Sequence, residues 1–238
     1  MHDQAPSLRA GGFVKRYLLM IAAALAVTAA PTAQADSNTV TVGDERIVIP
    51  AVSGFDNYTD DPKGQRLAAP LIESNAQLLS FQVQPGPLVR YLIVKVPKEI
   101  MSQSLSVPEF RTFTAYSRDN IRKQEQYGDL ATRQAAERHA QLNDTLAPGH
   151  DVENVEFDAP ILVGIDRDDD VAFTHTRLVP MRLSVDGKPG ATMVVMCASV
   201  ILVKGKYIIA QLFGPGKEVE WARSTCNKFV ADLAVQNK

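Results

Sequence analysis

The clearest pattern of apolar and polar positions lies between residues 191 and 238. Two apolar runs, residues 193–203 and 207–213, flank a Lys-Gly-Lys turn and predict a β-hairpin. After Gly214-Pro215-Gly216, apolar residues recur at the spacing of one helix face from about residue 217 to 236. This face consists of Ala222, Cys226, Phe229, Val230 and Leu233. The pattern therefore predicts a hairpin covered by a C-terminal helix.

Two further strand pairs and one short helix are expected before residue 100. Strands are predicted over residues 39–42 with 46–49 and over residues 78–83 with 88–96, each pair separated by turn residues. The strand over residues 88–96 is apolar at nearly every position, so both of its faces should be covered. Between the pairs, Asp60-Asp61-Pro62 is typical of a helix start, and the helix should end near Pro70.

A longer helical region is expected over residues 106–142. Ser106 and Glu109 form a capping box with a proline in the first turn. The apolar stripe is strong near Phe110 and weak after residue 124, so two helices are predicted, meeting near Gly128. The region is locally basic, and the interspersed acidic residues favour a solvated surface over a binding patch.

The remaining segments predict antiparallel strands and complete the fold class. Strands are expected over residues 151–165, 171–178 and 181–185, with Asp166–Asp170 as a turn. The chain is thus predicted to be an α+β protein with a mostly antiparallel sheet of hairpins, helices packed on the sheet, and a closing C-terminal helix. The arrangement is similar to an α/β/α sandwich. Residues 36–238 fit a single domain.

The N-terminus has the pattern of a secretory signal peptide. Lys15 and Arg16 precede an apolar run, and Ala33-Gln34-Ala35 matches a small-x-small cleavage site. Residues 1–35 are therefore expected to be removed after Ala35, which makes the mature protein periplasmic or secreted. An uncleaved anchor is the alternative, although the run is short for a bilayer. Translation could start at Met1 or at Val14, because the segment before Lys15 is long for a signal peptide.

Charge and composition narrow the range of partners. The chain carries 25 Lys and Arg against 27 Asp and Glu, a formal net charge of −2. Without a basic cluster, nucleic acid and anionic membrane surfaces are not expected as main partners. No later segment is apolar enough to span a bilayer, and no motif indicates a cofactor.

The two cysteines leave two interpretations open. Cys197 lies in a predicted strand and Cys226 on the apolar face of the last helix. In an exported chain they could form one disulfide. They could equally remain as two buried thiols, because free cysteine is among the most buried residue types. Neither has a C-x-x-C partner, which disfavours a redox-active dithiol.

Two groups of residues are weak candidates for chemistry. Asp166, Asp168 and Asp170 have the D-x-D-x-D spacing of a calcium loop, but the glycine and glutamate that complete it are missing. His150 and His175 lack the spacing of zinc ligands. No nucleophile motif is present. Solvated aspartates and surface histidines are the simpler interpretation, and no catalytic residue is assigned.

The end of the chain carries a resemblance to known proteins. Gly205-Lys206-Tyr207, Gly214-Pro215-Gly216 and the segment 229–233 resemble exported bacterial proteins of uncharacterised function. The order of elements is similar to the Mog1/PsbP-like α/β/α sandwich. This resemblance implies a binding or assembly accessory and identifies no ligand or functional residue.

Three functional hypotheses follow. The first is a periplasmic, non-enzymatic protein that binds another envelope protein or a small ligand. The second is a hydrolase or metal-dependent enzyme that uses His150, His175 and the Asp166–Asp170 turn. The third is an envelope assembly factor that acts through the helices of residues 106–142.

Overall fold

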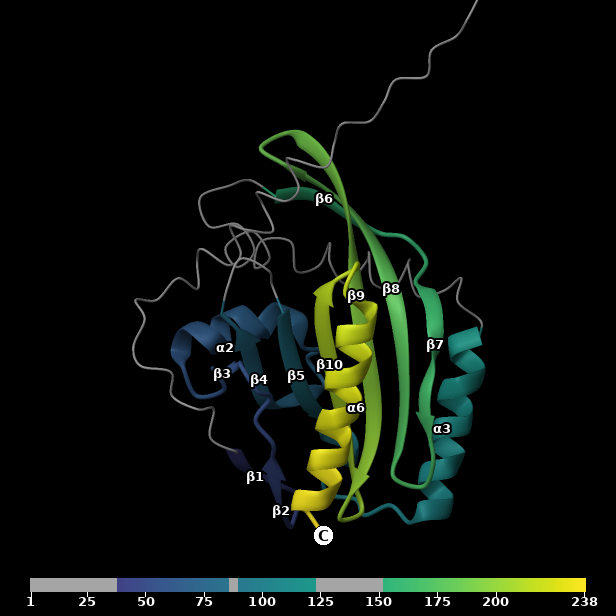
Figure 1. Cartoon of the computed structure of the whole chain (residues 1–238). Helices are drawn as coiled ribbons and strands as arrows, with labels where there is room; N and C mark the ends of the chain where they lie inside the picture. The colour runs from purple at the N-terminus through teal and green to yellow at the C-terminus, as the bar shows by residue number, and fades with distance from the viewer. Residues whose placement is uncertain (1–37, 86–89, 123–151) are drawn as a thin grey trace, which may run out of the picture.

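The computed structural model describes residues 38–85, 90–122 and 152–238. In these residues an eight-stranded antiparallel sheet is accompanied by a two-stranded hairpin and three α-helices (Figure 1). The α+β class and the closing C-terminal helix are therefore confirmed. The predicted signal peptide, the alternative start at Val14, the predicted helix after residue 128 and His150 lie outside the described residues.

The elements follow one another as a series of hairpins interrupted by helices. Their bounds are β1 (Asn38–Val42), β2 (Glu45–Ile49), β3 (Asp56–Asn57), α2 (Pro62–Ala68), β4 (Ala76–Gln84), β5 (Arg90–Pro97), α3 (Val107–Arg122), β6 (Val152–Phe157), β7 (Ile161–Asp168), β8 (Ala172–Val185), β9 (Lys188–Val203), β10 (Lys206–Pro215) and α6 (Val219–Gln236). Two short 3-10 helices cover Ala69–Leu71 and Lys98–Ile100.

The large sheet is centred on the C-terminal hairpin. The strand order is β3-β4-β5-β10-β9-β8-β6, and β7 also pairs with β8 on the side where β6 lies. β9 and β10 pair from Lys206 opposite Val203 to Pro215 opposite Val194. Lys204 and Gly205 turn the chain with φ angles of 48° and 75°. Two positive φ angles are typical of the type I′ turn, which matches the twist of the strands it joins.

β8 differs from the sequence prediction, because it is one strand where two were expected. Pro180 lies between the two predicted segments, inside β8 and opposite Met193. Its carbonyl accepts a hydrogen bond from the Asp158 backbone N–H at 3.1 Å. In a strand, the N–H and the C=O of one residue lie on the same side of the chain. The side of Pro180 that lacks an N–H therefore faces the gap between the part of β8 that pairs with β7 and the part that pairs with β6. No ladder bond is lost there, so the proline is tolerated.

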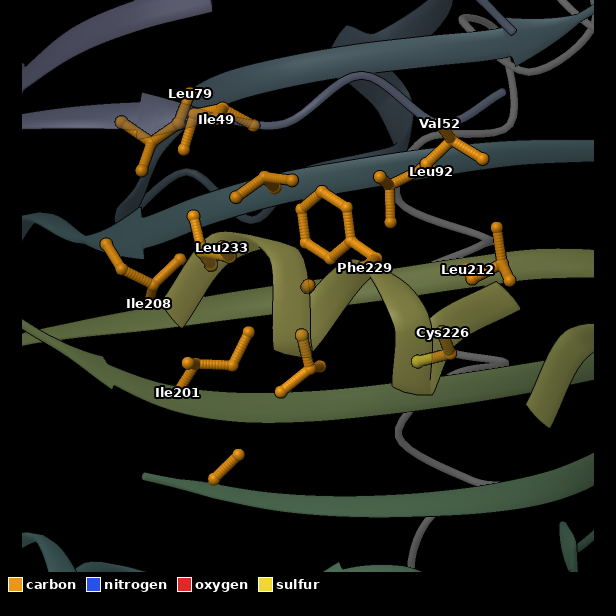
Figure 2. Close-up of a cluster of buried hydrophobic side chains, with 14 of the residues drawn as sticks. Ile49, Val52, Leu79, Leu92, Ile201, Ile208, Leu212, Cys226, Phe229 and Leu233 are labelled. Atoms are coloured by element: carbon orange, nitrogen blue, oxygen red, sulfur yellow. The ribbon is translucent and has the colours of Figure 1, made fainter. Parts of the chain in front are cut away.

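The helix α6 covers one face of the sheet and forms the main core. All five residues of its predicted apolar face are buried. Figure 2 shows Phe229 pointing into a cluster with Leu92 of β5 and Ile208 and Leu212 of β10. The burial of this face against the hairpin is the main hydrophobic contribution of the helix to stability.

The other face of the sheet carries α2 and α3. The Asp61 carboxylate accepts hydrogen bonds from the Lys63 and Gly64 backbone N–H groups at 2.7 and 3.0 Å, as the predicted helix start requires. Ser106 donates to the Glu109 carboxylate from its backbone N–H at 2.7 Å, which confirms the predicted capping box. In Figure 1, α3 lies beside β7 at one end of the sheet and α2 at the other.

The hairpin β1–β2 is held by the last residues of the chain. The Asn237 side-chain amide donates to the Val48 carbonyl and accepts from the Val48 N–H, both at 2.8 Å. Ile47 and Ile49 of the same hairpin are fully buried in the core under α6. The side chain of Asn237 therefore forms the two hydrogen bonds with Val48 that the backbone of a neighbouring strand would otherwise form.

Candidate functional site

The aspartates at the β7–β8 turn are engaged by arginines. The Arg118 Nη2 donates to Asp168 Oδ1 at 2.7 Å, and the Arg111 guanidinium pairs with the Asp170 carboxylate. Both arginines belong to α3. These two aspartates therefore attach α3 to the end of the hairpin. β7 extends to Asp168, so the turn is shorter than the predicted Asp166–Asp170 segment.

Asp166 points away from that group and into the interface with α6. Its side chain is 1% exposed, and its Oδ1 accepts from the Arg223 Nε at 2.6 Å. Its Oδ2 accepts from the Thr176 hydroxyl, also at 2.6 Å. Within the described residues, no group of three or more His, Cys, Asp or Glu side chains could hold a metal ion. The three aspartates of the calcium-like spacing thus have separate partners.

His175 lies on the opposite face of the sheet from Asp166. Thr176, which bonds Asp166, is its neighbour in β8, and successive strand residues point to opposite faces. The imidazole packs near the Phe173 ring, with centroids 5.8 Å apart. Burial, with a smaller effect from the Arg177 guanidinium, lowers the pKa of His175 to about 3. His175 is therefore neutral at physiological pH and separated from Asp166 by the sheet.

Both cysteines are free and buried under α6. Cys197 is 0% and Cys226 1% exposed. The Ser199 hydroxyl lies 3.4 Å from Cys226 Sγ. Hydrogen bonding with Cys226, followed by burial, raises the pKa of the Cys197 thiol. In the part of the chain that the structure describes, the two cysteines are therefore free and buried, and no disulfide joins them.

The described part of α3 shows how its basic residues are used. Arg111 and Arg118 are both committed to the aspartates of the β7–β8 turn. The exposed side chains of this helix are instead partly aromatic and aliphatic, with Tyr116 at 71% and Phe113 at 43% exposure. The basic residues of the predicted second helix lie outside the described residues.

β7 is the most unusual surface feature among the described elements. It pairs with β8 alone within these residues. Three branched aliphatic side chains along it are exposed, Ile161 at 50%, Val163 at 38% and Ile165 at 37%. A Cβ built on Gly164 meets no atom within 4 Å, so the space over the face of the sheet at this position is open. We refer to the segment 161–165 as the β7 edge.

Two features of this region were not recognised in the sequence. The sequence did not indicate that Arg223 forms an ion pair with Asp166, because an arginine beside the apolar stripe of a helix is common. The sequence did contain an indirect indication that Asp166 is buried, because this residue directly follows the apolar run of a predicted strand. Exposure of the β7 edge could not be inferred from the run itself, because apolar strands are equally common in covered positions.

Comparison with known proteins adds no family assignment. No family model matches the sequence, and no curated protein matches it. Among the described residues, no helix is long and apolar enough to cross a membrane.

Proposed function

We propose that this protein is an exported, non-enzymatic binding protein that holds another envelope protein by adding a strand of that partner to the β7 edge. The observation that carries this proposal is the combination of an edge strand with three exposed branched aliphatic side chains. The signal-peptide pattern at residues 1–35 supports the export part. The resemblance to Mog1/PsbP-like accessories agrees with a binding role.

The chemistry of the β7 edge favours strand addition. Edge strands are usually protected from pairing by charge, proline or a covering segment. The sequence Ile-Leu-Val-Gly-Ile at residues 161–165 contains neither charge nor proline. A partner strand would satisfy the outward backbone groups and cover the exposed aliphatic side chains, which together supply affinity in this mode of recognition.

The same segment restricts the partner. An uncharged aliphatic edge disfavours a charged segment, because burying an unpaired charge costs free energy. One register shift lies within the β7 edge, between Leu162 and Gly164, and a second follows it, between Ile165 and Arg167. Bulges disrupt regular pairing, so the added strand should be short, about five residues. We therefore expect an extended segment rich in branched aliphatic residues.

Site-specific photo-crosslinking in intact cells tests this proposal. A photoreactive amino acid at Val163 should give a defined adduct with one envelope protein. The matched control is the same residue at Val235, which is 63% exposed and belongs to the helix α6. Amide hydrogen exchange of the purified complex should then show new protection of residues 161–165, because strand pairing engages backbone N–H groups.

A charged variant distinguishes strand addition from non-specific hydrophobic binding. Val163→Lys with Ile165→Lys should abolish the adduct detected from a probe at Ile161, whereas Val235→Lys should leave it unchanged. Equal adducts from Val163 and Val235, or a complex without protection of the β7 amides, would contradict the proposal. Recovery of the full-length precursor from the cytoplasm alone would contradict its export part.

A further inference from the structure

The hydrogen bonds of β8 show which backbone groups of β7 point away from the sheet. The Ala172 carbonyl accepts from the Asp169 N–H at 3.0 Å, on the side of β7. The Val171 carbonyl accepts from the Leu202 N–H at 2.8 Å, on the side of β9. Backbone groups alternate between the two sides of a strand, so even-numbered residues of β8 face β7 and odd-numbered residues face β9. Residues of β7 that lie opposite odd-numbered residues of β8 therefore direct their N–H and C=O groups outward.

The outward groups of β7 have the spacing of a regular strand. They belong to Leu162, Ile165 and Asp168, which lie opposite odd-numbered residues of β8. These three residues are three positions apart in β7, but their partners on β8 are only two positions apart, because each register shift adds one residue to β7. The outward groups therefore recur about every 6.8 Å, as in a regular antiparallel strand. The register shifts disrupt the ladder on the β8 side and leave the outward side able to pair with a regular strand.

The helix α3 limits how much of this side an added strand can use. The Asp168 carboxylate accepts from Arg118 of α3 at 2.7 Å, and α3 lies beside β7 at this end (Figure 1). An added strand would therefore pair with the backbone of Leu162 and Ile165. The two residues that pair with them are separated by one residue of the added strand. This central residue lies level with Gly164, in the row that Gly164 shares with Thr176.

Gly164 leaves an open position on the face of the sheet that α6 covers. Residues directly opposite each other point to the same face, and Thr176, opposite Gly164, bonds the Asp166 carboxylate that Arg223 of α6 also holds. Among the described residues, a Cβ built on Gly164 meets no atom within 4 Å. The partner of Ile161 is two residues from Thr176 along β8, so Ile161 shares this face, and it is 50% exposed. The open position is thus bordered by an exposed aliphatic side chain.

We infer that Gly164 determines the specificity of the β7 edge, and that the partner strand carries a large aromatic side chain at its central residue. An aromatic ring on a neighbouring strand covers the backbone that a glycine leaves open, and so compensates for a glycine at a sheet edge. The same ring can contact Ile161, since aromatic and branched aliphatic residues form favourable cross-strand pairs. The residues on either side of the ring point to the other face, where Ile165 is 37% exposed, and these are the branched aliphatic ones. The inference rests on the proposed function, because it describes the strand that the β7 edge would bind.

Titration of the ¹⁵N-labelled protein with two synthetic peptides tests the inference by nuclear magnetic resonance. The peptides have the sequence Lys-Thr-Val-X-Val-Thr-Lys with blocked ends, where X is Phe or Ala. Both should shift the amide signals of residues 161–165. The Phe peptide should bind about ten-fold more tightly, because a partly buried ring contributes apolar contact that a methyl group lacks.

Substitutions of Gly164 provide the matched controls. Gly164 has no positive φ angle, so a β-branched residue is compatible with its backbone. Gly164→Val occupies the open position and should reduce the ratio of the two dissociation constants to about one, because the ring then has no space over the strand. Gly164→Ala fills the position only in part and should give an intermediate ratio, so the outcome does not depend on the folding of one variant. Circular dichroism checks that each variant keeps the fold of the parent.

The possible results separate the inference from the proposed function. Equal binding of both peptides to the parent, with shifts at residues 161–165, would overturn the inference and leave strand addition standing. An unchanged preference for the Phe peptide in Gly164→Val would also overturn it, because the ring would then bind elsewhere. Shifts confined to other residues, or no shift with either peptide, would refute the proposed function as well.

Discussion

The buried pair of Asp166 and Arg223 gives an asymmetric prediction for stability. Asp166 is 1% exposed, whereas Arg223 is 36% exposed and also contacts the exposed Glu220. Removing one partner of a buried ion pair costs about 3–5 kcal/mol when the remaining charge stays dry. Arg223→Met leaves the Asp166 carboxylate with the Thr176 hydroxyl alone. Because Arg223 is partly exposed, water can reach the vacated side, and we expect a loss of about 2 kcal/mol.

The reverse substitution should cost less. Asp166→Asn keeps an oxygen for the Thr176 hydroxyl, and Arg223 can turn toward solvent, so the expected loss is about 1 kcal/mol. The double variant should lie within about 1 kcal/mol of the parent, because no buried charge remains. Lys228→Met on the same helix is the matched control. Its pair with Asp232 is exposed, so its loss should not exceed about 0.5 kcal/mol.

Urea unfolding at neutral pH measures these differences. The single tryptophan, Trp221, packs parallel to the Phe55 ring with centroids 6.4 Å apart and therefore reports the docking of α6. Circular dichroism should give the same midpoints if unfolding is two-state. Equal losses for Arg223→Met and Lys228→Met would refute the reasoning, and so would a larger loss for Asp166→Asn than for Arg223→Met.

Two further predictions concern the core and the buried imidazole. Phe229→Ala should lower the free energy of unfolding by about 3–5 kcal/mol, and Val235→Ala by less than about 0.5 kcal/mol, in the same urea assay. The pKa of His175 falls from 6.5 to about 3 on folding. Between these two pH values, the imidazole binds a proton in the unfolded state but not in the folded state. The free energy of unfolding should therefore decrease as the pH decreases through this window. His175→Gln should reduce that slope by up to about 1.4 kcal/mol per pH unit in urea titrations between pH 4 and pH 6.

The local parts of the fold were predictable because their signals lie in adjacent residues. The turn at Lys204-Gly205, the cap at Asp61 and the apolar face of α6 each depend on a few neighbouring positions. The continuity of β8 through Pro180 was not predictable, since it depends on where β6 and β7 end beside it. A sequence pattern does not specify which strands become neighbours.

The candidate site was harder to predict for the same reason. Solvated aspartates were the simpler prediction, but Asp166 is buried, and the partners of Asp166 and Asp168 come from α6 and α3, about fifty residues away in the chain on either side. The β7 edge is apolar in sequence, as a covered strand would be. Its exposure follows from its position beside β8 at the margin of the sheet, which only the strand order determines.

The contact between Asn237 and Val48 also constrains how the chain is made. These residues are 189 positions apart. At a synthesis rate of about 5–20 residues per second, about 10–40 s pass between the synthesis of Val48 in the β1–β2 hairpin and the synthesis of Asn237. A two-stranded hairpin alone is marginally stable in water. Ile47 and Ile49 therefore remain uncovered until α6 has been synthesised, and a ribosome that stops before α6 releases a chain with an aggregation-prone β1–β2 hairpin.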